Sequence, residues 1–456
     1  MKNEITGKTL IDLGYQPSRW FGSAINYAND NNLNTDQLHN YIRSIIPRVV
    51  KPLNAPINFH KNILADSNCD VKNIESVYNA MNALLTTPTV VNASVMPDAC
   101  PTGNGEMPVG AIIATKDAIH PRMHSADICC SVMATDLGYV DPKKVLDVSF
   151  ETTHFGTGGR DRANQLIRLP FDLKEKIQGN HYLNSKKSLN HAHNDLGTQG
   201  DGNHFLFVGV SKSDNHTYLV THHGSRGFGA NLYKQGLIAA ESFRKKIAPN
   251  VDKKNAWIPF DTKEGRDYWG ALQIVREWTK LNHECLHNVI QKMVAGSVDS
   301  KRFWNEHNFV FKKDNVFYHA KGATPMDDCF VPDSCNGLRL IPLNMNQPIL
   351  VTKGLENSTS LGFAPHGAGR NFSRSEHKKN KLVDKTAEQL FLEETSSIDV
   401  RFFSGEIDIT ELPSAYKDSI RIKEQIKYFE LCTIVDEIEP YGCIMAGNID
   451  KPWRKK

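Results

Sequence analysis

Short apolar runs bounded by glycine, aspartate or asparagine recur along the chain beyond residue 100, and this pattern predicts buried β-strands. The expected strands are 109–115, 131–137, 205–210, 218–222, 309–311, 316–319, 339–342, 349–352 and 441–446. The third and fourth of these flank a polar Ser-Asp-Asn segment, which predicts a β-hairpin.

A different periodicity predicts one long helix over 267–294. Apolar residues recur there at spacings of three and four and form one stripe: Ile274, Trp278, Leu281, Cys285, Val289 and Met293. Charged helical segments are expected after Phe372, and residues 1–90 mix helical and loop signals. Because strands outnumber helices and do not alternate regularly with them, we expect an α+β fold with a sheet-based core and flanking helices. No linker separates the polar clusters described below, so we expect one large domain over 1–456, with the motifs lying within 96–418.

The composition indicates a globular protein from a reducing compartment. Hydrophobic residues make up 40% of the 456 residues and charged residues 23%, enough for a sizeable core. The net charge of +3 is too small to indicate a nucleic-acid partner by itself. No apolar run has the length of a membrane span, the N-terminus lacks the apolar stretch of a secretory signal, and the nine cysteines are too scattered for a disulfide framework. We therefore expect a cytoplasmic protein without a membrane partner, whose thiols are buried or bind metal.

Three polar clusters lie where predicted strands begin or end. In the first, Asp127 and Cys130 are three residues apart, so they can ligate one metal ion from a tight loop; the alternative is that the cysteines of this cluster simply pack in the core. The second places His204 before an apolar strand, and the third places His222 at the end of the next strand. Glycines after the third cluster let the backbone approach a ligand, and Arg226 can bind phosphate.

Three further clusters occur later in the chain, at 306–308, 319–324 and 365–370. In the last, His366 stands beside two glycines and is followed by Arg370 and Arg374. Such a loop can cradle phosphate and hold a nucleophile against it, although a plain glycine turn is the alternative.

One segment imitates a different enzyme class. His283-Glu-x-x-His287 fits the zinc-protease pattern. Both histidines fall in register with Arg276, Lys280 and Gln291, so we expect a solvated helix face and a chance match.

Taken in order, the clusters resemble the RtcB family of RNA-splicing ligases. The family's Asp-Val-Gly-Cys-Gly loop is similar to residues 127–131, and its Gly-Asn-His-Phe segment is matched at 202–205. Its other motifs are similar to His222-His223-Gly224-Ser225-Arg226-Gly227, His307-Asn308, Lys321-Gly322-Ala323, His366-Gly367-Ala368-Gly369-Arg370 and Ala415-Tyr416-Lys417-Asp418.

This resemblance implies a site and a reaction. One Mn²⁺ ion would be held by Asp127, Cys130 and His204, and a second by Cys130, His222 and His307. His366 would attack the α-phosphate of GTP and pass GMP to an RNA 3′-phosphate, which a 5′-hydroxyl end then attacks; a 2′,3′-cyclic phosphate would first be hydrolysed. The implied nucleotide-binding residues are Asn203, His366, Gly367, Ala368, Gly369, Arg370 and Tyr416. The implied phosphate- and RNA-binding residues are Arg226, Lys321 and Arg374.

The chain also departs from the family pattern. The metal loop has Cys129 and Ser131 in place of two glycines, and Cys100 stands where the family has histidine. Phe207 replaces a glutamate that contacts guanine, and Ala446-Gly447 replaces a Lys-Gly that also does so. The identity of the base therefore stays open, and two alternatives remain: an RNA-end nucleotidyltransferase or processing enzyme that uses another nucleotide, and a non-catalytic RNA-end-binding protein.

Overall fold

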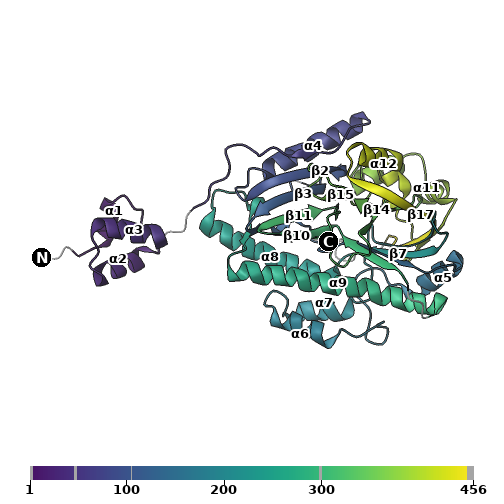
Figure 1. The fold of residues 1–456 in the computed structure, drawn as a ribbon, viewed down its shortest axis with the longest axis horizontal. Helices are drawn as coiled ribbons and strands as arrows, with labels where there is room; N and C mark the ends of the chain where they lie inside the picture. The colour runs from purple at the N-terminus through teal and green to yellow at the C-terminus, as the bar shows by residue number, and fades with distance from the viewer. Residues whose placement is uncertain (1–3, 46–48, 104, 297–299, 449–456) are drawn as a thin grey trace.

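The computed structural model describes residues 4–45, 49–103, 105–296 and 300–448, and two β-sheets lie at its centre (Figure 1). The first sheet has five strands, in the order β1 (His60–Lys61), β2 (Val90–Cys100), β3 (Val109–Lys116), β11 (Val316–Lys321) and β10 (Asn308–Lys313). The second has eight: β13 (Leu338–Pro342), β14 (Ile349–Gly354), β17 (Cys432–Met445), β6 (Phe205–Ser211), β7 (Thr217–His223), β5 (Ser131–Asp136) and β9 (Arg302–Glu306) in order, with β16 (Asp399–Phe402) pairing with β17. Two short pairs complete the strands, β4 (Ala118–Ile119) with β8 (Ile258–Pro259) and β12 (Ala323–Pro325) with β15 (Phe363–Pro365).

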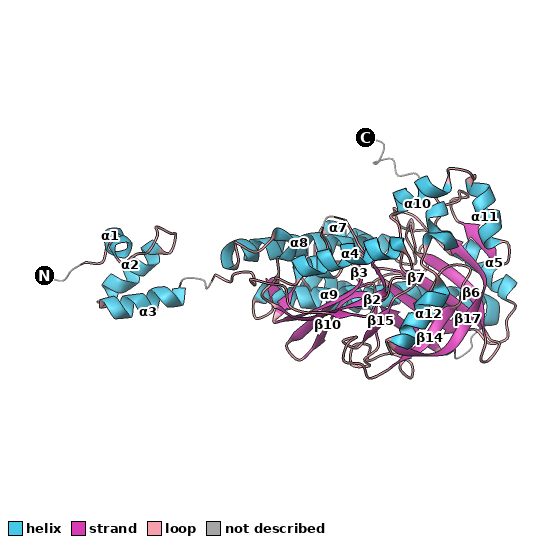
Figure 2. Ribbon diagram, turned by 90° about the horizontal axis from the view of Figure 1, so that it is seen from above, coloured by secondary structure: helices cyan, strands magenta, loops and turns pink. Residues whose placement is uncertain are grey.

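Helices cover the sheets, and the long pair α8 (Arg226–Ile247) and α9 (Lys263–Ala295) lies side by side along them (Figure 1). The Thr262 side chain caps α9 by accepting from the backbone N–H of Gly265, and the helix ends before Gly296 at φ +73°. In Figure 2, strands β2, β10 and β15 lie below helices α4, α7 and α8. The remaining helices of the larger part are α4 (Asn68–Leu84), α5 (Pro142–Thr152), α6 (Phe171–Gly179), α7 (Lys186–Asn194), α10 (Arg374–Lys381), α11 (Ala387–Thr395) and α12 (Ser419–Tyr428).

Three N-terminal helices have a hydrophobic core of their own. They are α1 (Gly7–Asp12), α2 (Phe21–Asp30) and α3 (Thr35–Ile45), and they lie apart from the sheets in both ribbon views (Figures 1 and 2). Their buried residues are Leu10, Ala24, Ala28, Leu38 and Ile42. The assignment of the whole chain to one domain stays a prediction, and a division would fall after α3.

The α+β fold with a sheet-based core is confirmed, and each expected strand overlaps a strand of the structure. The hairpin is confirmed as β6 and β7, which pair antiparallel. The predicted long helix is α9, which begins at Lys263. Helix α8 was not expected, because its glycines imitate a loop. Two of them permit close packing instead, since an added Cβ would lie 1.8 Å from Ser225 Oγ at Gly229 and 2.5 Å from Tyr268 OH at Gly236.

The expectation of a solvated face for the His-Glu-x-x-His segment is wrong. His283 and His287 are both fully buried. The reason is that this part of α9 packs on the second sheet, where polar side chains of β5 and β7 contact the two rings. Charged neighbours along the helix did not reveal this, because a buried polar face carries the same letters as a solvated one.

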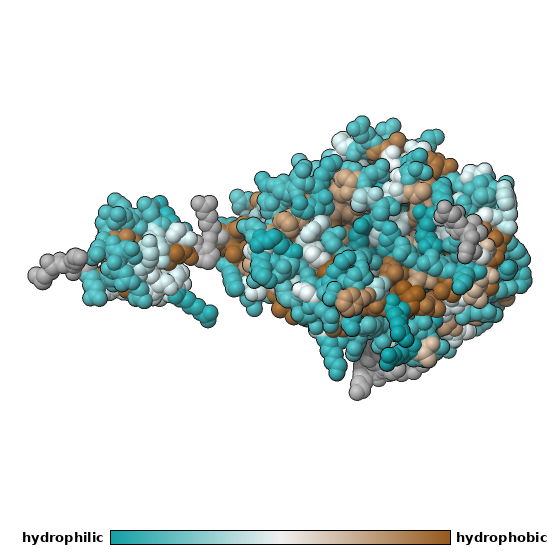
Figure 3. Space-filling view, turned by 60° about the horizontal axis from the view of Figure 1, so that its bottom comes forward, coloured by the Kyte–Doolittle hydropathy of each residue, from teal (hydrophilic) through white to brown (hydrophobic). Residues whose placement is uncertain are grey.

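The surface is ordinary for a globular protein. Hydrophilic residues cover most of the face seen in Figure 3. Among the helices of the described ranges, none combines the length and the apolar character that crossing a membrane requires.

Candidate metal centre and nucleophile

A pocket of about 1470 Å³ is lined by residues of both sheets and of helices α4 and α10. Two groups of possible metal ligands share Cys130, and all of their residues except His204 line this pocket. The groups are Asp127, Cys130 and His204, and Cys130, His222 and His307. Within each group the donor atoms lie within 4.8 Å of one another. The structure therefore brings together all five of the expected ligands.

The strand order of the second sheet explains this grouping. Strands β6, β7, β5 and β9 are consecutive neighbours, and each is antiparallel to the next. His204 precedes β6, His222 lies near the end of β7, Cys130 precedes β5 and His307 follows β9. In an antiparallel sheet, the start of one strand lies beside the end of its neighbour. Four segments distant in sequence thus present their donors at one edge.

The donor atoms converge closely. Cys130 Sγ lies 3.4 Å from His204 Nε2 and 3.2 Å from His222 Nε2. His204 Nε2 lies 3.0 Å from Asp127 Oδ2, and His222 Nε2 lies 3.3 Å from His307 Nε2. The converging donors are three imidazole nitrogens, one thiol and one carboxylate. Such a donor set suits a divalent transition metal.

The protonation states fit a metal site. The Nδ1–H of His222 donates to the carbonyl of Asn203 at 3.0 Å, which leaves the Nε2 lone pair facing Cys130. Burial lowers the pKa of His222 to about 3, so its ring is neutral at ordinary pH. Burial also raises the pKa of the Cys130 thiol well above its usual value, and the nearby Asp127 carboxylate adds to this. Without a cation the thiol is therefore protonated, and a bound ion would displace that proton.

The backbone around Asp127 restricts both the position of its carboxylate and the conformation of the loop that follows it. A Cβ added at Gly224 would lie 2.0 Å from Asp127 Oδ1, so only glycine fits beside this carboxylate. Cys129 adopts φ +60°, a conformation that favours glycine. Its backbone N–H donates to the Asn308 carbonyl at 2.6 Å, and this contact holds the loop in that conformation.

His366 follows β15 and faces the second ligand group. Its backbone N–H donates to Asp98 Oδ2 at 3.1 Å, and its Nδ1–H donates to the same oxygen at 2.6 Å. Asp98 is fully buried. The His366 and His307 ring centroids are 4.9 Å apart. With Nδ1 engaged, the Nε2 lone pair of His366 is available for attack on an electrophile beside the metal ligands.

Gly322, which directly precedes β12, lies close to the His366 ring, because β12 pairs with β15. A Cβ at Gly322 would lie 3.0 Å from both Nδ1 and Cε1 of His366, and Gly322 itself has φ +65°. The Gly322 backbone N–H donates to Asn308 Oδ1 at 2.7 Å. Gly322 of the Lys-Gly-Ala motif thus lies against the His366 ring, and Asn308 of the His-Asn motif holds Gly322 in place.

The three candidate phosphate-binding cations differ in how many hydrogen bonds they already make within the protein. Arg226 donates to the Gly156 carbonyl at 2.6 Å and is not among the residues that line the pocket. Lys321 Nζ reaches the pocket but donates to the Met107 carbonyl at 2.7 Å. Arg374 has a half-exposed side chain, so among these cations it is the one most open to an incoming phosphate.

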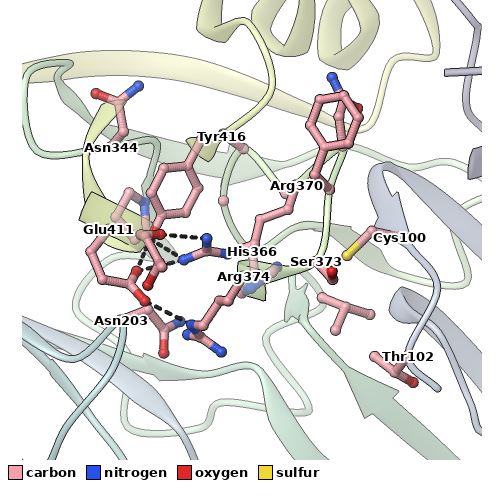
Figure 4. Close-up of a pocket in the computed structure, with 18 of the residues that line it drawn as sticks. Cys100, Thr102, Asn203, Asn344, His366, Arg370, Ser373, Arg374, Glu411 and Tyr416 are labelled. Carbon is pink, nitrogen blue, oxygen red and sulfur yellow. Dashed lines mark hydrogen bonds and ion pairs between the residues drawn. The ribbon is translucent and has the colours of Figure 1, made fainter. Parts of the chain in front are cut away.

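Arg370 belongs to a cluster centred on Glu411, a residue that the sequence did not single out (Figure 4). The buried Glu411 carboxylate accepts from Arg370 and from the Tyr416 hydroxyl, each at 2.5 Å, and from Arg374 at 2.9 Å. The Arg370 guanidinium also lies over the Tyr416 ring, 4.5 Å from its centroid. Glu411 therefore fixes three expected nucleotide or phosphate contacts at once.

Two other contributors were missed as site residues. The sequence around Asp98 carries no pattern that indicates its contact with His366. Lys417 Nζ donates to the carbonyls of Pro97 and Ala99 at 3.0 and 2.9 Å, and so fixes the strand on both sides of Asp98. The signal for Lys417 was present, since it directly follows Tyr416 in a motif already recognised.

One wall of the pocket is largely apolar. Its lining includes Phe205, Phe207, Leu343, Met345, Ile349, Cys443 and Met445. Polar amides are contributed there by Asn344 and Asn448. Phe207 is buried in this wall, so the position offers a base no carboxylate.

Comparison with known proteins gives one consistent family. A family model described as tRNA-splicing ligase RtcB matches residues 163–446. The chain is 28% identical over 358 residues to RNA-splicing ligase RtcB1 of Escherichia coli, which covers 71% of this chain and 83% of that protein. RNA-splicing ligase RtcB of another Escherichia coli strain is 27% identical over the same shares. The tRNA-splicing ligase RtcB of Aeropyrum pernix is 27% identical over 54% of this chain and 58% of its own length.

Proposed function

Because the chain belongs to the RtcB family, we propose that it is an RNA ligase that joins a 3′-phosphate or 2′,3′-cyclic phosphate end to a 5′-hydroxyl end through a nucleotide held on His366. The RNA ends would arise in RNA repair or in tRNA splicing, and the names of the relatives support the second source.

The observation that carries this proposal is the environment of His366. The Nδ1–H of His366 donates to Asp98, so Nε2 is the ring nitrogen left to face the metal ligands. A neutral imidazole in that state is a competent nucleophile toward phosphorus. In the proposed first step a bond forms between Nε2 and the α-phosphorus of GTP, and pyrophosphate leaves.

The next two steps return the histidine to its starting state. An oxygen of the RNA 3′-phosphate attacks the same phosphorus, and the bond to Nε2 breaks. The 5′-hydroxyl of the second RNA then attacks the activated 3′-phosphate, its proton is lost, and GMP leaves. Arg374, whose side chain is half-exposed, is the cation we assign to the incoming RNA phosphate.

The two donor groups, both of which include Cys130, would hold two Mn²⁺ ions. When bound, such ions supply charge neutralisation for the triphosphate and for the leaving group. The chain's own part is to hold the donors at one sheet edge and to keep the facing lone pairs unprotonated.

The base is the less constrained part of the nucleotide. We assign GTP from the family, but the wall around Phe207 is apolar and Glu411 is fully engaged by Arg370, Arg374 and Tyr416. These contacts favour a second candidate function, in which the same centre transfers a different nucleotide to an RNA end.

A joining assay tests the proposal. Purified protein with Mn²⁺ and GTP is given one RNA ending in a 2′,3′-cyclic phosphate and another beginning with a 5′-hydroxyl. A joined product is expected, absent with His366→Ala and retained with His181→Ala, a half-exposed histidine outside the pocket. A capped but unjoined 3′ end would favour the second function, and no reaction with metal bound would contradict both.

A further inference from the structure

The two histidines of the His-Glu-x-x-His segment sit directly behind the metal centre. Side chains alternate across a strand, so Cys130 and His222 face the pocket while Ser131 and Thr221 face α9. His283 Nε2 lies 3.0 Å from Ser131 Oγ, and His283 Nδ1 lies 2.6 Å from Thr221 Oγ1. Each contact is therefore made with the immediate sequence neighbour of a proposed metal ligand.

The contacts continue through the sheet as one chain. Thr221 Oγ1 also lies 2.7 Å from His287 Nε2, and His287 Nδ1 lies 2.7 Å from Thr135 Oγ1. Thr135 Oγ1 accepts from Arg302 Nε at 2.8 Å. The His283 ring is further fixed by stacking on the His223 ring, with centroids 3.5 Å apart and 14° between planes.

The groups at the two ends of this series of hydrogen bonds determine which atom carries each hydrogen. His283 Nε2 also lies 3.3 Å from the His223 carbonyl, which can only accept, so Nε2 carries the hydrogen. Burial lowers the pKa of both His283 and His287 well below the usual value, so each ring is neutral with one N–H. His283 Nδ1 must then accept from the Thr221 hydroxyl.

The hydrogen bonds from Thr221 to Arg302 also have fixed directions. Thr221 has one hydroxyl hydrogen, so its oxygen accepts from His287 Nε2–H. His287 Nδ1 then accepts from the Thr135 hydroxyl. Arg302 can only donate, and it does so to Thr135 Oγ1. Every donor in the chain has an acceptor, and no ring nitrogen of the two histidines is left for a metal ion. The pocket lining includes neither histidine, which argues against a zinc protease.

Other residues of α9 hold the remaining ligand segments. Arg276 pairs with Glu306, the neighbour of His307. Asn282 Oδ1 accepts from the Gly197 backbone N–H at 2.5 Å, in the loop that leads to His204. One face of α9 thus contacts the neighbourhood of every histidine ligand.

We propose that His283 and His287 are positioning residues of the metal centre, which hold the ends of β5 and β7 through Thr221 so that Cys130 and His222 can share one divalent ion. The inference rests on the proposed function only in requiring that the two donor groups bind metal. Removal of the Thr221 hydroxyl would leave two buried ring nitrogens without partners, and the strand ends would shift to relieve this.

The test is a pair of substitutions of similar size at one position. Thr221→Val removes the hydroxyl at nearly constant volume, and Thr221→Ser keeps it. The Mn²⁺ dissociation constants of the full chain are measured by calorimetry, together with the thiolate-to-metal absorption when Co²⁺ is added. We expect Thr221→Val to weaken binding about 10- to 100-fold, the range for residues that orient metal ligands, and Thr221→Ser to bind like the parent.

The melting temperature separates positioning from a merely structural role. A lower melting temperature for Thr221→Val with unchanged Mn²⁺ affinity would overturn the inference. If Thr221→Val does not fold, His283→Gln takes its place: the Gln amide nitrogen can still donate toward Ser131, but no acceptor stands at the position of Nδ1, where the Thr221 hydroxyl donates, and the same loss of affinity is expected. A parent protein that binds no Mn²⁺ would overturn the proposed function as well, whereas equal binding by parent and variants would overturn this inference alone.

Discussion

Asp98 accepts two hydrogen bonds from His366, although 268 residues separate them in sequence. Both bonds end on Oδ2, so one carboxylate oxygen fixes the backbone and the ring tautomer together. Lys417 fixes the backbone on either side of Asp98. His366, the proposed nucleophile, is therefore oriented by contacts from strand β2 and from the loop of Lys417.

Asp98→Asn tests this orientation. The amide can present an N–H where Nδ1–H now donates, which would turn the ring toward the tautomer with hydrogen on Nε2. We expect formation of the nucleotidyl-histidine to slow by about 10²- to 10⁴-fold, as for other losses of acid–base positioning, with Mn²⁺ binding unchanged. Single-turnover labelling measures this, with Asp172→Asn on α6 as the control. An unchanged rate would mean that Asp98 does not set the tautomer.

Gly224→Ala tests the first ligand group. The added methyl would lie 2.0 Å from Asp127 Oδ1, so the carboxylate has to move away from His204. We expect one Mn²⁺ ion fewer per chain in equilibrium dialysis, with loss of joining activity. Gly179→Ala is the matched control, because nothing lies within 4 Å of a Cβ there. Full metal content in Gly224→Ala would contradict the assignment of Asp127.

Metal binding should depend on pH through Cys130. Burial raises the pKa of this thiol, so it is protonated in the metal-free protein at neutral pH, and binding must release that proton. The affinity should therefore rise with pH, by up to about tenfold per unit while the pH stays below the thiol pKa. Titrations at several pH values, with proton release measured in weak buffer, check this. Cys130→Ala should remove the release and nearly all activity; a pH-independent affinity in the parent would argue against a bound thiolate.

Phe207→Glu tests the base pocket. The substitution places a carboxylate in the apolar wall, where it can accept from the N–H groups on the guanine edge. We expect the ratio of GTP to ATP labelling to rise by about tenfold or more, while Phe207→Leu leaves it near the parent value. A ratio that does not respond to Phe207→Glu would place base recognition elsewhere in the pocket.

Strand positions could be predicted because apolar runs bounded by polar residues are a local pattern, whereas the grouping of the metal ligands was implied by the resemblance to the RtcB family. The contacts of Asp98 and Glu411 could not be predicted, since each pairs with residues far away in sequence and no local periodicity marks it. His283 shows the opposite error. Its neighbours Arg276 and Lys280 suggested solvent, but Arg276 pairs with the fully buried Glu306 and His283 itself is buried against the sheet. The sequence alone does not distinguish a helix face whose polar side chains hydrogen-bond inside the protein from one whose polar side chains hydrogen-bond to water.

His366 is the residue that we propose carries the nucleotide. The direct measurement is incubation of the protein with Mn²⁺ and either GTP or ATP labelled at the α-phosphate, followed by a denaturing gel, with His366→Ala and His181→Ala beside the parent. We expect acid-labile label on the parent and on His181→Ala and none on His366→Ala, and the labelled lane would identify the base. Label that persists on His366→Ala, or none on a folded, metal-bound parent with either nucleotide, would contradict this proposal.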